Sequence, residues 1–159
     1  MADLAVDRIF ATKTRSGRES FPIANGVTLP VGALVALEGG YLNHYADGAN
    51  DVFVGIVLGP GMGISPGAAI TGNTSGTPVP EARVDCSGVT LVGLSSVGGS
   101  PDATKVGDLV YSADSDTDSM TLDDTGRTHP IGYMARFGSA SDVDVTLFTP
   151  TEMLSQATA

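Results

Sequence analysis

The stretch "VGDLVYSADSDTDSMTLDDTGRTHPIGYMARFGSASDVDVTLF", residues 106–148, decides the fold. Its short apolar runs are separated by clusters of Asp, Ser, Thr and Gly, which are residues that favour turns. Near its end Val143, Val145 and Leu147 alternate with polar residues, as expected for a strand that buries one face. The stretch therefore predicts successive strands joined by short turns.

The same pattern extends toward the N-terminus and predicts an all-β fold. Glycine makes up 21 of the 159 residues, whereas the helix formers Lys, Glu, Gln and Arg are scarce. Many short strands of this kind are typical of a compact β-sandwich or a β-barrel-like domain. Eight strands are predicted, at residues 33–37, 52–58, 82–86, 89–94, 109–113, 120–123, 131–137 and 143–148.

The chain is long enough for one domain with a substantial core. We expect an extended N-terminal arm at residues 1–20, a β domain at residues 21–148 and a C-terminal tail at residues 149–159. Thr149 and Glu152 have the spacing of a capping box, which predicts that a short helix begins in the tail. Such a helix is too short to be stable without docking.

Charge is distributed unevenly along the chain. Residues 1–20 carry four basic and three acidic side chains, whereas the remaining 139 residues carry four basic and fifteen acidic ones. An acidic body argues against a nucleic-acid partner, because that affinity comes mostly from Lys and Arg contacts with phosphates. The longest apolar stretch, residues 52–59, is too short to cross a bilayer, so no membrane partner is expected either. The N-terminus lacks the apolar run of a secretory signal, which predicts synthesis in a cytoplasm.

Two parts of the sequence resemble each other. "LPVGALVAL" around Gly32 is similar to "TKVGDLVYS" around Gly107, and each is followed by a second glycine in an apolar run, Gly55 in "FVGIV" and Gly132 in "PIGYM". Each unit has the order turn, strand, loop, strand. The similarity indicates either a duplication or two solutions to the same β geometry.

Residues 59–80, "GPGMGISPGAAITGNTSGTPVP", lie between the two similar units. They are so rich in Gly and Pro that no regular element can run through them. Long loops in compact domains tend to be functional or disordered. This loop is therefore a candidate for a surface that contacts a partner.

The run of aspartates is the strongest apparent metal motif. Asp114, Asp116 and Asp118 occupy the first, third and fifth positions of a calcium-binding loop. Ser119 stands where that loop needs glycine, and Thr125 stands where it needs a bidentate glutamate. We therefore interpret the run as an acidic, solvated hairpin tip and keep its aspartates only as weak metal candidates.

No pattern in the sequence indicates catalysis or a cofactor. Cys86 is the only cysteine, and the alternation in "ARVDC" places it on the inward face of a strand, which favours a packing role. His44 and His129 have no neighbours at metal-ligand spacing, so we interpret both as ordinary edge residues. The sequence predicts a protein that is not an enzyme.

The unit "VGDLVYSA" followed by an acidic loop, a short strand, "IGYMA" and the terminal strand "VDVTLF" resembles the small capsid decoration (cement) proteins of tailed bacteriophages. Residues 106–148 carry the resemblance well, and residues 29–58 carry it less closely. The resemblance implies a structural virion protein on the capsid exterior that stabilises the shell. It also implies the major capsid protein as partner and self-association as a homotrimer.

In that interpretation the N-terminal arm contacts the capsid. An arm with modest charge can become ordered on a partner and cover a large area, at the cost of ordering entropy. A different interpretation is a β-sandwich binding or adhesion module, of the head-fibre or carbohydrate-binding type, with weak calcium binding at the aspartates. A hydrolase with a site assembled in space is a third. The predicted partner-binding residues are Arg8, Phe10, Lys13, Arg15 and Arg18.

Overall fold

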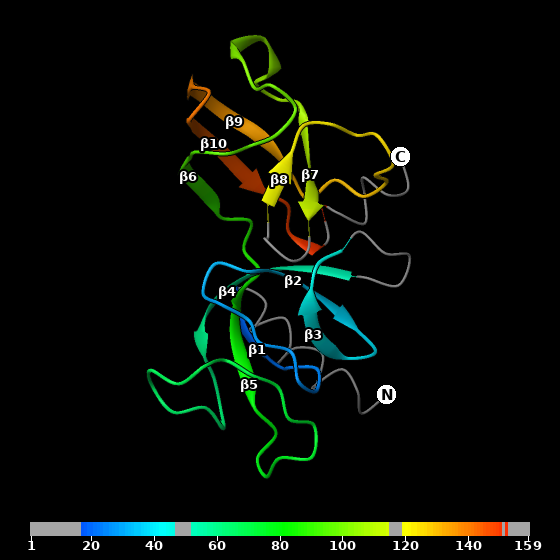
Figure 1. Cartoon of the computed structure of the whole chain (residues 1–159), viewed down its shortest axis with the longest axis vertical. Helices are drawn as coiled ribbons and strands as arrows, with labels where there is room; N and C mark the ends of the chain where they lie inside the picture. The colour runs from blue at the N-terminus through cyan, green and yellow to red at the C-terminus, as the bar shows by residue number, and fades with distance from the viewer. Residues whose placement is uncertain (1–16, 47–51, 115–118, 151, 153–159) are drawn as a thin grey trace, which may run out of the picture.

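The structure is a computed structural model that describes residues 17–46, 52–114, 119–150 and 152. It confirms the all-β prediction: ten strands form two five-stranded antiparallel sheets, one of them curved into a half-barrel, in a sandwich-like arrangement. Figure 1 shows the sheets as two lobes stacked along the long axis of the molecule. The N-terminal lobe contains β1 (Arg18–Pro22), β2 (Leu34–Glu38), β3 (Tyr41–His44), β4 (Val52–Pro60) and β5 (Glu81–Asp85). The C-terminal lobe contains β6 (Thr90–Leu94), β7 (Leu109–Asp114), β8 (Ser119–Thr121), β9 (Gly132–Ser139) and β10 (Asp142–Leu147), with a short 3-10 helix η1 (Ala103–Lys105).

All eight predicted strands are present, with ends that differ by one or two residues, and two further strands were not predicted. β3 was missed because "YLNH" does not alternate in polarity; it is placed by the Gly39–Gly40 turn that returns the chain along β2. β1 was missed because Arg18, Glu19 and Ser20 are polar. It pairs with β5 at the edge of the sheet, so residues 18–20 of the predicted arm belong to a strand.

The two lobes have the same topology. The strand order is β1-β5-β4-β2-β3 in the N-terminal lobe and β6-β10-β9-β7-β8 in the C-terminal lobe, so each strand has a counterpart five strands later in the chain. All these strand pairs are antiparallel. A shared order of five strands is far more specific than the two short motifs that first indicated it.

Backbone hydrogen bonds match between the lobes residue by residue. Gly32 N donates to Val57 O at 2.9 Å just before β2, and Gly107 N donates to Met134 O at 2.8 Å just before β7. Both glycines have positive φ, 91° and 97°, a conformation that side chains disfavour. The motif seen twice in the sequence is therefore the entry to the same strand of a repeated five-stranded unit.

The second glycine of each unit allows a close approach between strands. A Cβ atom at Gly55 in β4 would overlap the carbonyl oxygen of Asp85 in β5. A Cβ atom at Gly132 in β9 would likewise overlap the carbonyl oxygen of Thr146 in β10. Gly55 also has φ +149°, which adds backbone strain for any other residue.

Each lobe has its own core, built from matching positions. In the N-terminal lobe the buried side chains include Ile23, Val35, Leu42, Val54, Val57, Ala82 and Val84. In the C-terminal lobe the counterparts, in the same order, are Val97, Val110, Met120, Ile131, Met134, Val143 and Val145. The same pattern of inward-facing residues therefore forms two separate cores.

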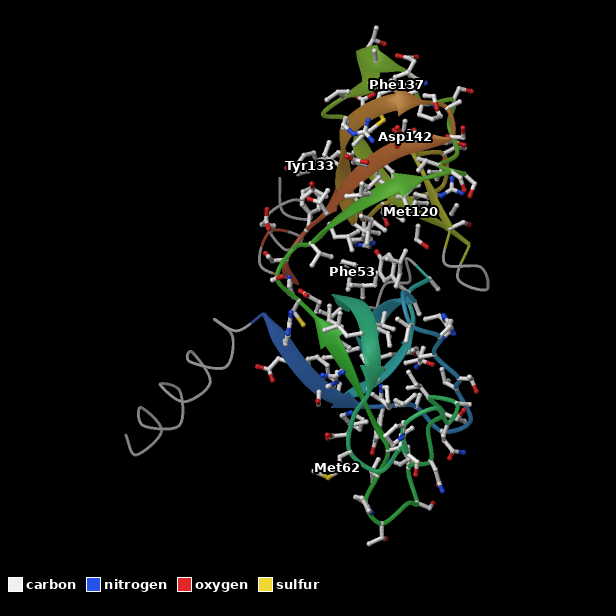
Figure 2. All side chains as sticks on the ribbon, turned by 90° about the vertical axis from the view of Figure 1, so that its left-hand side faces the viewer. Phe53, Met62, Met120, Tyr133, Phe137 and Asp142 are labelled. Carbon is white, nitrogen blue, oxygen red and sulfur yellow. The ribbon has the colours of Figure 1, made fainter. Side chains whose placement is uncertain are left out.

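The lobes are joined through the second face of the N-terminal sheet. Val35 in β2 faces the N-terminal core, whereas Leu34 and Ala36 on either side of it pack with the C-terminal core. Tyr45 and Phe53 join them there in an edge-to-face ring contact with centroids 5.2 Å apart. Figure 1 shows β2 running across the junction, and Figure 2 shows Phe53 pointing into it. Burying a side chain such as Phe53 contributes about 2–3 kcal/mol, so the junction is a substantial part of the core.

The described chain enters and leaves the body at this junction. Gly17 lies against Ser87, which belongs to the segment that links the lobes, and Cys86 N donates to Gly17 O at 2.6 Å. Gly88 in the same segment lies against Thr149, which follows the last strand.

One hairpin differs strongly between the lobes. β9 and β10 are joined by the two residues Ala140 and Ser141, whereas β4 and β5 are joined by residues 61–80. Because β4 extends to Pro60, the first two residues of the predicted loop belong to the strand. The loop folds back on its lobe: Leu29 N donates to Ile70 O at 2.8 Å, and Ile70 is buried.

The close approach at Gly55 predicts a large loss of stability on substitution. Gly55→Ala is expected to lower the free energy of unfolding by at least about 2 kcal/mol, because the added Cβ meets the backbone of β5 at a positive φ. Gly59→Ala in the same strand is the control; its Cβ would meet only the mobile end of Arg83 at 3.3 Å, so the change should stay below about 0.5 kcal/mol. Urea unfolding measures both, and equal stabilities would contradict the proposed strand packing.

Candidate binding surface

The outer face of the N-terminal lobe contains a hollow of about 340 Å³, called here the outer hollow. In β5, Ala82 and Val84 point into the core, so Glu81 and Arg83 point outward. Their neighbours in the hollow come from the strands on either side of β5. The lining residues are Arg18, Glu19 and Ser20 from β1, Leu58 from β4, and Glu81 and Arg83 from β5.

Arg83 lies opposite a residue that has no side chain. A bulge in β4 shifts the register with β5, and after it Gly59 pairs with Arg83. The guanidinium Nη2 of Arg83 lies 3.3 Å from the place where a Cβ of Gly59 would be. Within the described residues, none of the ion pairs contains Arg83.

The matching position of the C-terminal lobe holds a closed ion pair. The bulge recurs in the register of β9 with β10, and after it Arg136 pairs with Asp144, so Gly59 corresponds to Arg136 and Arg83 corresponds to Asp144. Arg136 Nε donates to Asp144 Oδ2 at 2.7 Å, and Arg136 Nη2 donates to Asp144 Oδ1 at 3.1 Å. Hydrogen bonding from Arg136 is the largest cause of a lowered pKa at Asp144, followed by the bond from Gly93 N.

Asp142 also takes part in this cluster. Arg136 Nη2 donates to Asp142 Oδ1 at 2.7 Å, so one guanidinium holds two carboxylates on the outer face of the C-terminal lobe. Figure 2 shows Asp142 at the end of β10 farthest from the junction. The two lobes thus use the same outer position differently: one lobe pairs its arginine with carboxylates, and the other presents its arginine in a hollow.

Two other cations of the described chain support loops. Arg127 Nε donates to Ser112 O at 2.9 Å, which ties the segment after β8 to β7. Lys105 Nζ donates to Gly99 O and to Ser100 O, both at 2.7 Å, in the connection between β6 and β7. These two side chains hold the fold together, whereas Arg18 and Arg83 line the outer hollow.

The structure brings together two features that the sequence singled out separately. Arg18, predicted as a partner-binding residue, lines the outer hollow together with Glu81. Glu81 N donates to Met62 O at 2.9 Å, so the start of the Gly- and Pro-rich loop lies beside the hollow. Met62 is 62% exposed, and Figure 2 shows it on the outside of the N-terminal lobe. The other predicted partner-binding residues, Arg8, Phe10, Lys13 and Arg15, lie outside the described residues.

Arg83 was missed as a candidate, although the sequence contained a signal for it. The alternation in "EARVD" places Glu81 and Arg83 on the outward face of a strand. The neighbouring strand β1 was not predicted, so nothing indicated that Arg18 lies beside them. A hollow lined by three strands, one of them distant in the sequence from the other two, cannot be predicted from each strand's pattern alone.

The predicted hairpin around the aspartates is confirmed, because β7 and β8 pair through Asp114 and Ser119. Asp116 and Asp118 lie outside the described residues, and so does the side chain of Asp114. In the part of the chain that is described, no three His, Cys, Asp or Glu side chains are grouped as metal ligands. The metal prediction for these aspartates therefore stays a prediction.

Cys86 and the two histidines contact ordinary protein groups. Cys86 packs against the N-terminal core, and burial raises the pKa of its thiol to about 11, with Glu19 and Asp85 adding to the shift. His44 Nε2 lies 3.0 Å from Thr28 O, and His129 Nδ1 lies 2.9 Å from Thr128 Oγ1. The packing role predicted for Cys86 fits this environment, because a protonated thiol is a poor nucleophile.

The predicted capping box at the start of the tail is present. Thr149 N donates to Glu152 Oε1 at 3.1 Å, and Glu152 N donates to Thr149 Oγ1 at 3.2 Å. These reciprocal bonds satisfy backbone donors that the first turn of a helix leaves open. The rest of the predicted tail helix lies outside the described residues.

Comparison with known proteins gives no relative: no protein family, no curated protein and no solved structure matches the chain. Of the elements described, none is a helix of the length and apolarity that a membrane span requires.

The environment of Cys86 predicts slow alkylation. At pH 8 the thiolate fraction of the folded protein should be about 100-fold lower than that of the unfolded chain, because the pKa is raised from 9.0 to about 11. Iodoacetamide labelling followed by mass spectrometry, with and without urea, measures the difference. Equal labelling rates in the two conditions would show that the thiol is not held as described.

The Arg136 cluster predicts a specific dependence of stability on pH. Because Arg136 lowers the pKa of Asp144 in the folded protein, the pair stabilises the fold above the ordinary carboxyl pKa of 3.8, and this contribution is lost as pH falls through the lowered pKa. Arg136→Gln should therefore lower Tm by a few degrees at pH 7 and by less at pH 2. A loss of the same size at both pH values would contradict an electrostatic role.

Proposed function

We propose that the protein is a structural virion protein that binds the outer surface of a phage capsid and stabilises the shell as a decoration protein. The observation that carries the proposal is that the family-like segment coincides with four consecutive strands of one five-stranded lobe. Residues 106–148, which resemble decoration proteins, form the paired strands β7 to β10. The weaker resemblance at residues 29–58 falls on β2 to β4, the counterparts of β7 to β9 in the other lobe.

The position of the described N-terminus supports a contact made by the arm. Residues 1–16 precede Gly17, and Arg18 next to it lines the outer hollow. Those sixteen residues carry three of the four basic side chains in the first twenty residues, whereas the body is strongly acidic. The arm and the hollow would together form one capsid-binding region on the N-terminal lobe, with the major capsid protein as partner.

Attachment as a homotrimer would allow each copy to bind the capsid only weakly. When three copies are linked, binding of the first copy raises the effective concentration of the other two at the capsid surface. A modest contact at each hollow is then sufficient for stable decoration. The net charge of −10 would keep unattached copies soluble.

Removal of residues 1–16 tests the arm without disturbing the sheet. Because β1 begins at Arg18, the truncated protein should keep its Tm within a few degrees and should lose capsid binding. Binding is measured by cosedimentation with empty capsid shells, assembled from the major capsid protein encoded beside this chain. Electron microscopy then locates the bound protein on the shell. Density on the outer surface for the full-length chain supports the proposal, and its absence at saturating protein overturns it.

Comparing the truncated protein with the full-length chain tests the role of the arm separately from decoration itself. Truncated protein that binds shells as tightly as the full-length chain would exclude the arm as the contact. Full-length chain that binds no shells would exclude decoration itself.

A further inference from the structure

The two lobes provide an internal comparison for Arg83. They share strand order, the bulge after which Gly59 pairs with Arg83, and the pattern of core residues. At the position after the bulge the C-terminal lobe holds an arginine together with a carboxylate across the strand pair. The N-terminal lobe holds an arginine opposite glycine. The arginine of the C-terminal lobe thus has a carboxylate across the strand pair, whereas Arg83 has glycine there.

The structure gives a reason to expect an occupant from outside the lobe. Arg83 lines a hollow of about 340 Å³ that opens on the surface, and its guanidinium lies over Gly59 in β4, where no side chain stands opposite it. In the C-terminal lobe the equivalent space is filled by the Arg136 side chain and its two carboxylates. The planar guanidinium matches a carboxylate through two parallel hydrogen bonds, as Arg136 does with Asp144.

We infer that the outer hollow receives an Asp or Glu side chain of the partner protein and that Arg83 binds its carboxylate. Arg18 also lines this hollow. Leu58 in the hollow and the exposed Met62 beside it provide apolar contacts for the residues around the carboxylate. The inference rests on the proposed function, in which the partner is a capsid subunit.

The composition of the hollow favours one carboxylate over a more highly charged anion. Glu19 and Glu81 line the hollow together with the two arginines, so its formal charge is balanced. A phosphate group would bring up to two negative charges close to these carboxylates, and like charges repel most strongly at short range. A single carboxylate adds only one charge and can approach Arg83 from the open side of the hollow.

Two measurements test the inference separately from the proposed function. In the first, the isotopically labelled full-length protein is titrated with the peptide acetyl-Ala-Glu-Ala-amide and, as the matched control, with acetyl-Ala-Gln-Ala-amide. The Glu peptide should shift the NMR signals of Arg83 and its neighbours in β1 and β5, and the Gln peptide should not. Equal shifts with both peptides, or none with either, would overturn the inference whether or not the protein binds capsids.

In the second measurement, Arg83→Gln and Arg83→Glu are compared with the native protein in cosedimentation with capsid shells. Loss of a hydrogen-bonded charged contact should weaken binding by about tenfold for Arg83→Gln, with a larger loss for Arg83→Glu. Val92→Glu, at an exposed position of the other lobe, makes the same charge change as Arg83→Gln and should alter binding by less than about twofold. Arg83 is a surface residue, and unchanged Tm values would confirm that the variants are folded.

The outcomes distinguish the two ideas. If native protein binds shells and Arg83→Gln binds them equally well, the hollow is not the contact and the inference fails while the proposed function stands. If native protein binds no shells, the proposed function fails, and the peptide titration alone decides whether the hollow binds carboxylates.

Discussion

The packing of both faces of β2 is the contact on which the arrangement of the molecule depends. A strand that alternates strictly in polarity can face only one core, but in "LVALE" Leu34 and Ala36 are as apolar as Val35 between them. The strand is therefore buried on both sides, with one lobe behind each face. Tyr45 strengthens the same contact, because its hydroxyl donates to His129 O at 3.3 Å and its carbonyl oxygen accepts from Ser112 Oγ at 3.4 Å. Two similar units are thus held as one body.

Much of the fold could be predicted from local patterns, because strands with one buried face display that face in the sequence. Val143, Val145 and Leu147 are an example, and β10 is placed as their alternation predicts. β1 could not be found in this way, since an edge strand of polar residues gains its stability from pairing with β5. The extent of the repeat was also hidden, because matching positions keep their burial but not their residue types, as with Leu42 and Met120.

The candidate surface was less predictable than the fold, for a physical reason. Arg18 was identified from its place in a basic arm, yet its position depends on a strand pair that links residues more than sixty apart in the sequence. Arg83 is recognised as a candidate only when it is compared with Asp144, which occupies the matching position in the other lobe. The C-terminal lobe has the structural ion pair and the short turn at Ala140, whereas the N-terminal lobe has the long loop at residues 61–80 and an arginine in a hollow. The difference between the two lobes, rather than any single motif, is the reason for proposing the N-terminal lobe as the binding lobe.

The edge position of β1 has a mechanical consequence. Tension applied through the arm would reach the body at Gly17, where the first bond is the one from Cys86 N to Gly17 O. Because β1 pairs with β5 alone, such a pull directed away from the sheet would break the pairs in turn from Arg18 toward Pro22, a peeling motion that resists little force. A pull along the strand would instead load all the bonds at once. The direction of such a pull would therefore determine how much force separates β1 from the sheet.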